Sequence, residues 1–362
     1  MKILIISTIK PYNGSGSGIT DYTYQLINHI KPLLSKDDSI NNLFALKEAK
    51  KANVLGLMSV NTTFKREISA IPKSEYDVIH ITDQEIGFVA KLLKESHNTA
   101  YIITTVHDLA RFENGLHKGI KQNIYNRLVM GSIVDAIKYS DLLLCNSSRT
   151  YKTIRQKFPD AIKKLKLIHH GIDDKFLGTK RKSKIIIKEN RFVIGYIGAL
   201  AYHKNVIFVL KVAKELKNDP KYILEIYGNG PEIKRLMKFK KRYNLNNVKF
   251  KGFVNEREKM RAYDNFDVFL FPSLYEGFGL PILEAQSFGL PVIILKTSDI
   301  SKEITKHCLI ISSPRKAAET IRKLRLKRMN IRQKRILIKY TNNFDWRYTA
   351  ELTLKAYKKV KA

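Results

Sequence analysis

The sequence predicts an α/β protein made of two doubly wound, Rossmann-like domains, and three observations support this class. Short apolar and β-branched runs alternate with amphipathic stretches along the chain. The alternation pauses at a polar and basic stretch, residues 178–191, and then starts again. The chain has 362 residues, too many for one ordinary core, which suits two domains of roughly 150–200 residues each. We therefore expect one domain over 1–178 and a second over 191–340.

Continuous apolar runs define the expected strands, because strands of a parallel sheet are buried on both faces. In the first domain these runs are residues 2–8, 76–82, 100–106, 141–147 and 165–170. In the second domain they are residues 191–198, 222–228, 248–253, 267–273, 291–296 and 308–313. Amphipathic stretches such as Thr20–Leu34 and Lys118–Tyr139 predict helices between the strands.

The composition is that of a globular protein, with 44% hydrophobic and 27% charged residues. No apolar run approaches the roughly 20 residues of a membrane-spanning helix. The first residues lack a small-residue cleavage site and are expected to form a strand, not a signal peptide. Only Cys145 and Cys308 are present, so we expect no disulfide framework and a cytoplasmic location.

The formal net charge is +33, from 66 basic and 33 acidic residues. Such an excess favours an anionic partner: a nucleotide, an anionic lipid headgroup or a nucleic acid. The alternative is a compositional bias with the charge simply solvated. Residues 314–339 concentrate the excess, with eleven basic residues and one acidic residue.

Ligands of doubly wound sheets bind at the carboxyl ends of the strands, so the residues that follow each strand are the candidates for a site. After the first strand, Gly14, Gly16 and Gly18 lead into a helix expected near Thr20. Such a loop offers backbone N–H groups to an anion, although it can equally be a linker. It lacks the pattern of a nucleotide-hydrolase phosphate loop.

Polar residues also follow the other strands of the first domain. They include 82–87, His107, Asp108, Asn146 and 171–173. We expect these groups to meet at one edge of the sheet, with a structural cap as the alternative role for the histidine.

In the second domain, Gly198 follows a strand and Lys204 stands where a helix begins. A lysine at that position can neutralise a phosphate. The turn at 228–230 follows the next strand and precedes a helix.

Glu276 and Glu284 flank a Gly-Phe-Gly-Leu-Pro turn, the first in a loop and the second about one turn inside the next helix. The glycines let the backbone approach a ligand closely. An ionised carboxylate accepts hydrogen bonds only, which suits two vicinal hydroxyls. The layout therefore favours a ligand with a diol beside a phosphate, such as a nucleotide sugar. The alternative is a glutamate placed there by the helix dipole.

Together these motifs resemble the retaining glycosyltransferases of family 4, whose GT-B fold has two Rossmann-like domains facing each other across a cleft. The most specific element is "EGFGLPILEA" followed by "FGLPVI". Further matches cover almost the whole chain: "NGSGSGITDYTYQL", "TTVHDL", "CNSSRT", "IHHGID", "YGNGPE", "KFKGFV" and "FLFPSLYEGFG". The end of the chain, 341–362, resembles the family's C-terminal helix that returns to the first domain.

The resemblance implies a role for single residues. Glu284 would hold the ribose hydroxyls, Glu276 would contact the transferred sugar, and Lys204 would bind the pyrophosphate. The implied catalytic residues are Glu276, His107 and Lys204. The implied donor-binding residues are Glu284, Gly277, Phe278, Gly279, Leu280, Lys204, Gly16, Gly18, Gly198, Gly228, Phe253 and Val254. The implied acceptor-side residues are Gly16, Ser17, His107, Asp108 and Asn146.

One position departs from the family pattern. Members usually carry an arginine directly after the glycine that matches Gly198, and here the residue is Ala199. No Asp-x-Asp strand end is evident, so no metal or other cofactor is expected, and neutralisation of the pyrophosphate falls on Lys204 and backbone dipoles. His203 and Arg149 are the candidates for a replacement cation.

The function implied is transfer of a hexose, with retention of configuration, from a nucleotide sugar to a glycan or lipid-linked hydroxyl. The basic excess adds a possible peripheral contact with an anionic membrane. A basic nucleic-acid- or ligand-binding protein on a GT-B scaffold is the alternative, although residues 314–339 contain no aromatic residue for base stacking before Tyr340. A GT-B epimerase or phosphorylase is a third reading, which the glutamate spacing and chain length disfavour.

Overall fold

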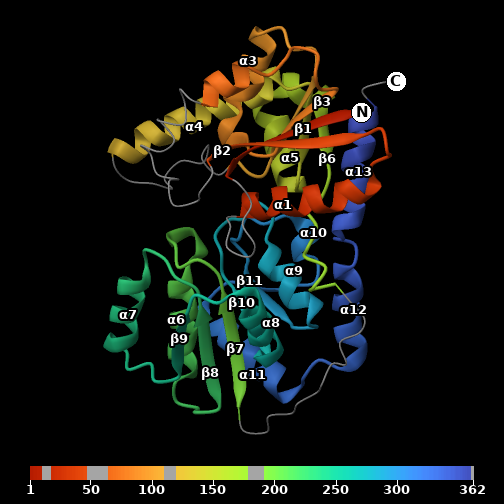
Figure 1. The fold of residues 1–362 in the computed structure, drawn as a ribbon. Coiled ribbons are helices and arrows are strands. Elements are labelled where there is room, and N and C mark those ends of the chain that lie inside the picture. Colours follow the sequence, from red (N-terminus) through yellow and green to blue (C-terminus); the bar gives the residue numbers. More distant parts are fainter. Residues whose placement is uncertain (10–17, 47–63, 110–119, 178–190, 360–362) are drawn as a thin grey trace. The chain divides into compact units, whose positions relative to one another are not determined.

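A computed structural model describes residues 1–9, 18–46, 64–109, 120–177 and 191–359. The chain forms two compact units, of which one combines Met1–Gly171 with Trp346–Ala362. The other is the intervening segment Ile172–Asp345. Figure 1 shows both units coloured along the sequence.

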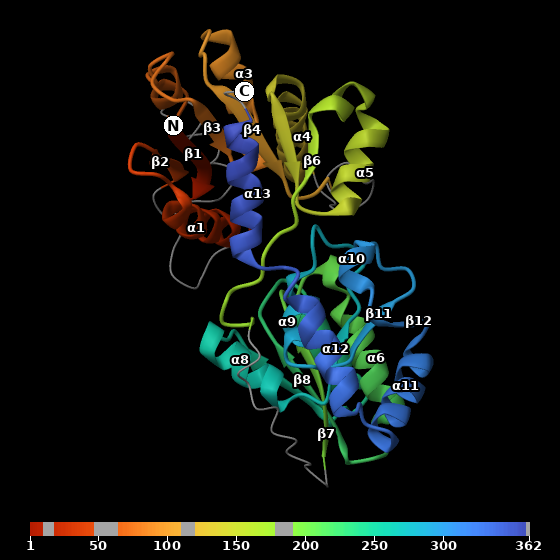
Figure 2. The same cartoon turned by 90° about the vertical axis from the view of Figure 1, so that its right-hand side faces the viewer.

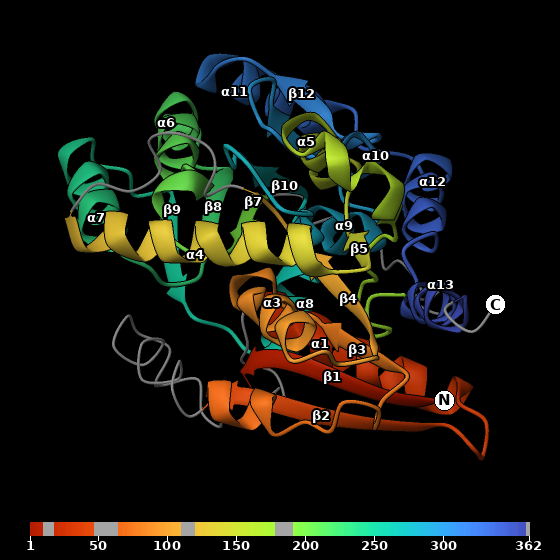
Figure 3. The same ribbon diagram turned by 90° about the horizontal axis from the view of Figure 1, so that it is seen from above.

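The first unit contains a six-stranded parallel sheet in the order β2-β1-β3-β4-β5-β6. The strands are β1 (Lys2–Ile9), β2 (Ser39–Leu46), β3 (Val78–Ile81), β4 (Tyr101–Val106), β5 (Leu142–Cys145) and β6 (Leu165–Leu167). Figure 3 shows β1 and β2 side by side at the edge of this sheet.

Helices cover both faces of that sheet. They are α1 (Gly18–Ile30), α3 (Phe88–Glu95), α4 (Ile120–Tyr139), α5 (Ser148–Lys157) and α13 (Trp346–Lys358), with short 3₁₀ turns at 31–33, 84–86 and 159–164. The last helix packs on α1, as Figure 2 shows, and it buries Trp346, Leu354 and Tyr357 in a core shared with β1. The end of the chain therefore completes the unit with which the chain begins.

The second unit contains another six-stranded parallel sheet, in the order β12-β11-β10-β7-β8-β9. Its strands are β7 (Phe192–Ile197), β8 (Tyr222–Tyr227), β9 (Val248–Gly252), β10 (Val268–Phe271), β11 (Val292–Leu295) and β12 (Leu309–Ile311). Its helices are α6 (Val206–Leu216), α7 (Ile233–Arg242), α8 (Glu256–Asn265), α9 (Leu280–Ser287), α10 (Lys302–Thr305), α11 (Pro314–Leu326) and α12 (Ile331–Thr341), with a 3₁₀ turn at 202–204. One continuous apolar core joins the sheet to these helices.

The predicted α/β class is confirmed, and each of the eleven expected runs contains a strand. The sequence reading missed β2. That strand lies at the edge of its sheet, and its polar residues Asn41 and Asn42 are exposed. An edge strand of this kind lacks the continuous apolar run on which the prediction relied.

Candidate functional site

The second sheet reverses its strand order between β7 and β10, which are neighbours although β8 and β9 separate them in the chain. In open α/β sheets, ligands bind outside the carboxyl ends of the strands at such a switch point. Lys204 ends the short 3₁₀ turn after β7, and Glu276 lies in the loop after β10. The sequence-predicted residues therefore stand where this topology places a site.

Lys204 and Glu276 form a close ion pair across that switch point. The Lys204 ammonium donates to both carboxylate oxygens of Glu276, at 2.7 and 2.8 Å. The two side chains are only 17% and 10% exposed. A pair held this closely fixes the ammonium at the edge of the sheet, because Glu276 is itself tied through its backbone N–H to Asp299.

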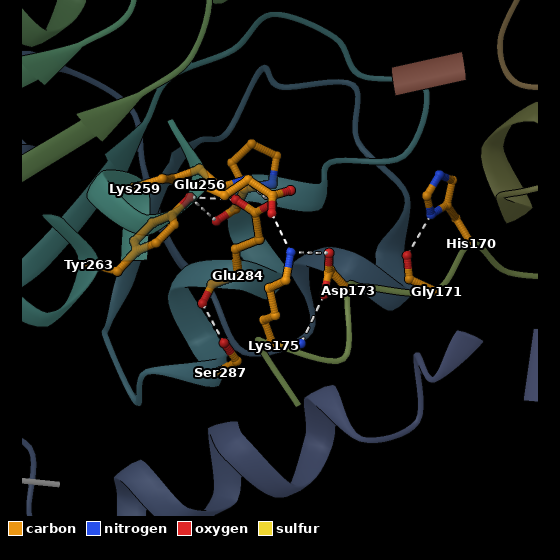
Figure 4. Close-up of polar contacts among 10 residues, drawn as sticks. His170, Gly171, Asp173, Lys175, Glu256, Lys259, Tyr263, Glu284 and Ser287 are labelled. Atoms are coloured by element: carbon orange, nitrogen blue, oxygen red, sulfur yellow. Dashed lines mark hydrogen bonds and ion pairs between the residues drawn. The ribbon is translucent and has the colours of Figure 1, made fainter. Parts of the chain in front are cut away.

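A second lysine–glutamate pair involves a lysine that the sequence reading did not select. Glu284 is the fifth residue of α9, and its carboxylate accepts from Lys259 Nζ at 2.7 Å and from the Tyr263 hydroxyl at 2.8 Å. Figure 4 shows Lys259 and Tyr263, both from α8, converging on this carboxylate. The orientation of Glu284 is thus set by two side-chain donors, and not by the helix dipole alone.

Lys259 and Tyr263 are four residues apart and so lie on the same face of α8. This spacing was the only sign in the sequence that the two residues act together. The residues around them do not show that their face of α8 contacts Glu284, which lies on α9. The Lys259 ammonium also lies 4.9 Å from the centre of the Phe176 ring. A cation over an aromatic face is stabilised, which further fixes the position of this ammonium.

Glycines bring the backbones of neighbouring strand ends together. Gly228 has φ +127°, and a Cβ there would lie 1.9 Å from the Gly198 carbonyl oxygen. The Gly198 N–H donates to the Tyr227 carbonyl at 3.0 Å, and the Leu200 N–H to that of Asn229 at 2.9 Å. The conformation and the close approach both require glycine at 228.

The loop after β10 leads directly into α9. Gly277 precedes Phe278, whose side chain is buried and packs edge-to-face on Phe344. Gly279 caps the helix with φ +106°, and Leu280 begins it. The first turn of a helix leaves backbone N–H groups without intrahelical acceptors, so this loop directs such donors to the edge of the sheet.

The loop after β9 presents an exposed ring. Phe253 is 66% exposed, and Val254 beside it is half-buried.

The loop after β7 holds Ala199 and His203. Ala199 is exposed, and its carbonyl accepts from the Tyr196 hydroxyl at 3.0 Å. His203 stacks on Tyr275 with ring centres 5.0 Å apart.

In the first unit, His107 lies at the carboxyl end of β4 in a buried polar cluster. Its Nε2 is 2.9 Å from the Thr82 carbonyl, and its Nδ1 is 3.4 Å from Asn146 Nδ2. Its backbone N–H donates to the side chain of Gln84. Burial lowers the pKa of His107. The expected convergence of polar strand ends is therefore observed for these residues.

Arg149 is buried at the start of α5 in this unit. Asp108 is half-buried, and Gly18 is the first residue of α1. The predicted residues Gly14, Gly16 and Ser17 lie outside the described residues.

The sequence reading did not select two other buried histidines of this unit. His80 Nδ1 lies 2.5 Å from the Tyr357 hydroxyl, and its Nε2 lies 2.7 Å from Thr105 Oγ1. His170 Nδ1 lies 2.6 Å from the Gly171 carbonyl, as Figure 4 shows, and its ring meets Trp346 edge-on. Burial lowers the pKa of each of these histidines to about 3. Both are neutral at physiological pH.

Within the described ranges, no group of three or more His, Cys, Asp and Glu side chains is placed to hold a metal ion. No helix among the described residues is long and apolar enough to cross a membrane.

A protein-family model matches most of the second unit. Residues 179–344 match the model of the family described as "Glycosyl transferases group 1". The chain carries a glycosyltransferase domain. This domain contains both lysine–glutamate pairs, the Gly198–Gly228 contact and the glycine loop before α9.

Curated relatives extend the likeness of the glycosyltransferase domain to most of the chain. An O-antigen biosynthesis glycosyltransferase, WclY of Escherichia coli, is 25% identical over 343 residues, which are 92% of each chain. An Escherichia coli enzyme named UDP-Gal:α-D-GlcNAc-diphosphoundecaprenol α-1,3-galactosyltransferase is 27% identical over 71% of this chain and 67% of its own.

Solved structures confirm the GT-B fold. Sucrose-phosphate synthase from Thermosynechococcus elongatus superposes with a TM-score of 0.75 at 16% identity, covering 99% of both chains. Anabaena HepE in complex with UDP and glucose superposes with a TM-score of 0.71 at 17% identity, also covering 99% of both chains. The predicted function is confirmed as that of a glycosyltransferase.

Proposed function

We propose that the protein is a retaining glycosyltransferase of family 4 that moves a hexose from a nucleoside-diphosphate sugar to an acceptor hydroxyl. The observation that carries the proposal is the pair of lysine-bound carboxylates, Glu276 and Glu284, at the carboxyl edge of the sheet in the glycosyltransferase domain. The relative named as a UDP-Gal galactosyltransferase supports a hexose donor, and both it and HepE support a uridine nucleotide.

The residues of the domain suit the parts of such a donor. Glu284 accepts hydrogen bonds from the ribose hydroxyls, since an ionised carboxylate has acceptor sites beyond those that Lys259 and Tyr263 occupy. Lys204 faces the diphosphate and stabilises the charge that grows on it as the sugar–phosphate bond breaks. The acceptor oxygen forms the new bond to the same sugar carbon, and its proton passes to the leaving phosphate. No metal ion is required in this scheme.

The direct test is the reaction itself. The protein is incubated with UDP-, GDP- and ADP-sugars and with an extract containing glycan and lipid-linked acceptors, and products are identified by mass spectrometry. We expect one donor to yield a product heavier by one hexosyl group, and NMR of the new linkage to show the donor's anomeric configuration. Absence of both nucleotide binding and product across the panel would exclude the proposal.

Replacing Glu284 by alanine should weaken binding of the nucleoside diphosphate about tenfold or more. Each hydrogen bond to a charged group contributes about 1.5–3 kcal/mol, and the substitution removes the acceptor of the ribose hydroxyls. Isothermal titration with the diphosphate measures the effect. Glu215→Ala, which removes an exposed carboxylate on α6, is the control and should bind as the wild type does. Unchanged affinity in folded Glu284→Ala protein would remove this residue from the site.

We further propose that the acceptor is lipid-linked or close to a membrane. The relative that acts on a diphosphoundecaprenol-linked sugar supports this class of acceptor. The turn between α11 and α12 presents apolar side chains that could insert into a membrane surface, because Leu326 is 87% exposed and Ile331 is 50% exposed. Exposed Lys327 and Arg332 flank these apolar side chains. Basic residues attract anionic lipid while apolar ones insert at the headgroup level.

Flotation with vesicles containing anionic lipid should recover the protein at low salt and release it at high salt. Each Lys or Arg near such a surface contributes about 1 kcal/mol. The double variant Lys327→Glu/Arg332→Glu should lose flotation. The control Lys238→Glu/Lys241→Glu makes the same change in net charge on exposed positions of α7 and should still float. An equal loss of flotation in both variants would assign the effect to net charge instead of to the turn between α11 and α12.

A further inference from the structure

We infer that Lys259 recognises the ribose of the nucleoside. Lys259 and Glu284 would bind the same ribose hydroxyl, the lysine as a hydrogen-bond donor and the glutamate as an acceptor. The inference rests on the proposed function and names a residue that the motifs of the sequence do not single out. It starts from the 2.7 Å contact between Lys259 Nζ and the Glu284 carboxylate.

The two oxygens of Glu284 have different surroundings. Oε2 accepts from the hydroxyl of Tyr263, a residue that is 0% exposed, so this oxygen is directed toward the core. Oε1 accepts from Lys259, whose side chain is 23% exposed. We therefore expect a ligand to approach Glu284 on the Oε1 side, where Lys259 lies.

The chemistry of a hydroxyl group matches this arrangement. A hydroxyl donates one hydrogen bond and has two acceptor lone pairs. A ribose hydroxyl that donates to Glu284 presents its lone pairs toward Lys259. The lysine ammonium has three N–H donors, so one ammonium can donate both to Glu284 and to a hydroxyl. A carboxylate beside an ammonium can therefore accept the hydrogen bond of a hydroxyl and donate one to its oxygen. A carboxylate alone can only accept from the hydroxyl, and leaves its lone pairs without a donor.

The position of the ammonium is fixed before any ligand arrives. The Phe176 ring lies 4.9 Å from Nζ, and the other end of the pair is held by Tyr263. Because the groups are pre-organised, little side-chain freedom remains to be lost on binding. The pair also leaves the local charge balanced, so that an anionic nucleotide does not meet a bare carboxylate.

The test compares ribose with deoxyribose ligands. Titrations of UDP, GDP and ADP first identify a diphosphate that binds the wild type, and its 2′-deoxy and 3′-deoxy forms are then titrated. Lys259→Met should weaken binding of the ribose form about tenfold. For one of the two deoxy forms, the same substitution should change affinity less than about twofold, because the hydroxyl to which the lysine binds is already missing.

Arg261→Met is the matched control, since it removes one positive charge from an exposed position two residues away on α8. It should bind all three ligands as the wild type does. Thermal unfolding of each variant shows whether the fold is kept. If Lys259→Met itself unfolds, Lys259→Met/Glu284→Gln, which removes both charges of the pair, replaces it and is compared with Glu284→Gln alone.

The outcomes separate the inference from the proposed function. If Lys259→Met weakens the ribose form and both deoxy forms equally, the lysine acts only through charge and the inference is wrong. An unchanged affinity for the ribose form also overturns it. If no diphosphate binds the wild type at all, the proposed function fails instead.

Discussion

Replacing Lys204 by methionine is expected to lower kcat about 100-fold or more while weakening donor binding much less. The ammonium lies at the switch point of the sheet. In the proposed reaction it faces the diphosphate, where negative charge grows only as the sugar–phosphate bond breaks. The loss of one such donor typically costs about 100- to 1000-fold in kcat. Position 199, where the resembled family has a second cation, holds alanine, so we expect a greater dependence on Lys204. Steady-state kinetics with the donor identified above, together with titration of the diphosphate, measure both quantities.

The control for this prediction must separate catalysis from folding. Without its lysine, the Glu276 carboxylate, which is 10% exposed, loses its partner, and breaking a buried pair destabilises a protein by up to about 3–5 kcal/mol. Lys204→Met/Glu276→Gln removes both charges and should recover much of the stability but not the turnover. Ala199→Arg, at an exposed position, should raise the turnover of Lys204→Met. Full activity in folded Lys204→Met would assign the phosphate-facing charge to another residue.

The first unit should lose stability steeply as pH falls below about 6.5, the pKa of histidine in an unfolded chain. Burial lowers the pKa of His80 and His170 to about 3 in the folded protein. The unfolded state therefore binds more protons between these values, and stability rises with pH across that window. Each histidine contributes about 1.4 kcal/mol per pH unit, so the two together remove about 5 kcal/mol at pH 4.5.

The single tryptophan makes this effect measurable in one unit. Trp346 is buried beside His170, with ring centres 4.8 Å apart, and its fluorescence reports unfolding of the first unit. Urea denaturation followed at this residue should give a midpoint that falls with pH. His80→Gln should flatten that dependence by roughly half, whereas His203→Gln, in the other unit, should leave it unchanged. Equal slopes in all three proteins would mean that carboxylates, and not these histidines, govern the acid sensitivity.

The sequence predicted the fold well because the strands of this protein are mostly buried on both faces. A run such as Val268–Phe271 is apolar throughout, and no helix of that length is expected between turn residues. The edge strand Ser39–Leu46 was missed because only its backbone pairing with β1, and not its side-chain pattern, defines it as a strand. That pairing brings together residues more than thirty positions apart, which local patterns do not show.

The candidate site was predictable where a residue belongs to a strand-end motif. Lys204, Glu276 and Glu284 each follow a strand within one βα unit, so their common edge could be inferred. Lys259 was not predictable in this way. It lies on a helix with Arg257 and Arg261 as close basic neighbours, and only tertiary packing selects the one that meets Glu284.

The discontinuity of the first unit has a consequence for biosynthesis. Its core includes Trp346, Leu354 and Tyr357, which the ribosome adds only after the whole of the second unit, the uninterrupted segment Ile172–Asp345. Domains usually fold in the order of their synthesis, from the N-terminus. Here the second unit is complete first, and the strands of Met1–Gly171 keep part of their apolar surface uncovered until residues 346–358 have been made. A chain that lacks residues 346–358 therefore leaves that apolar surface exposed to chaperones, although its glycosyltransferase domain is complete.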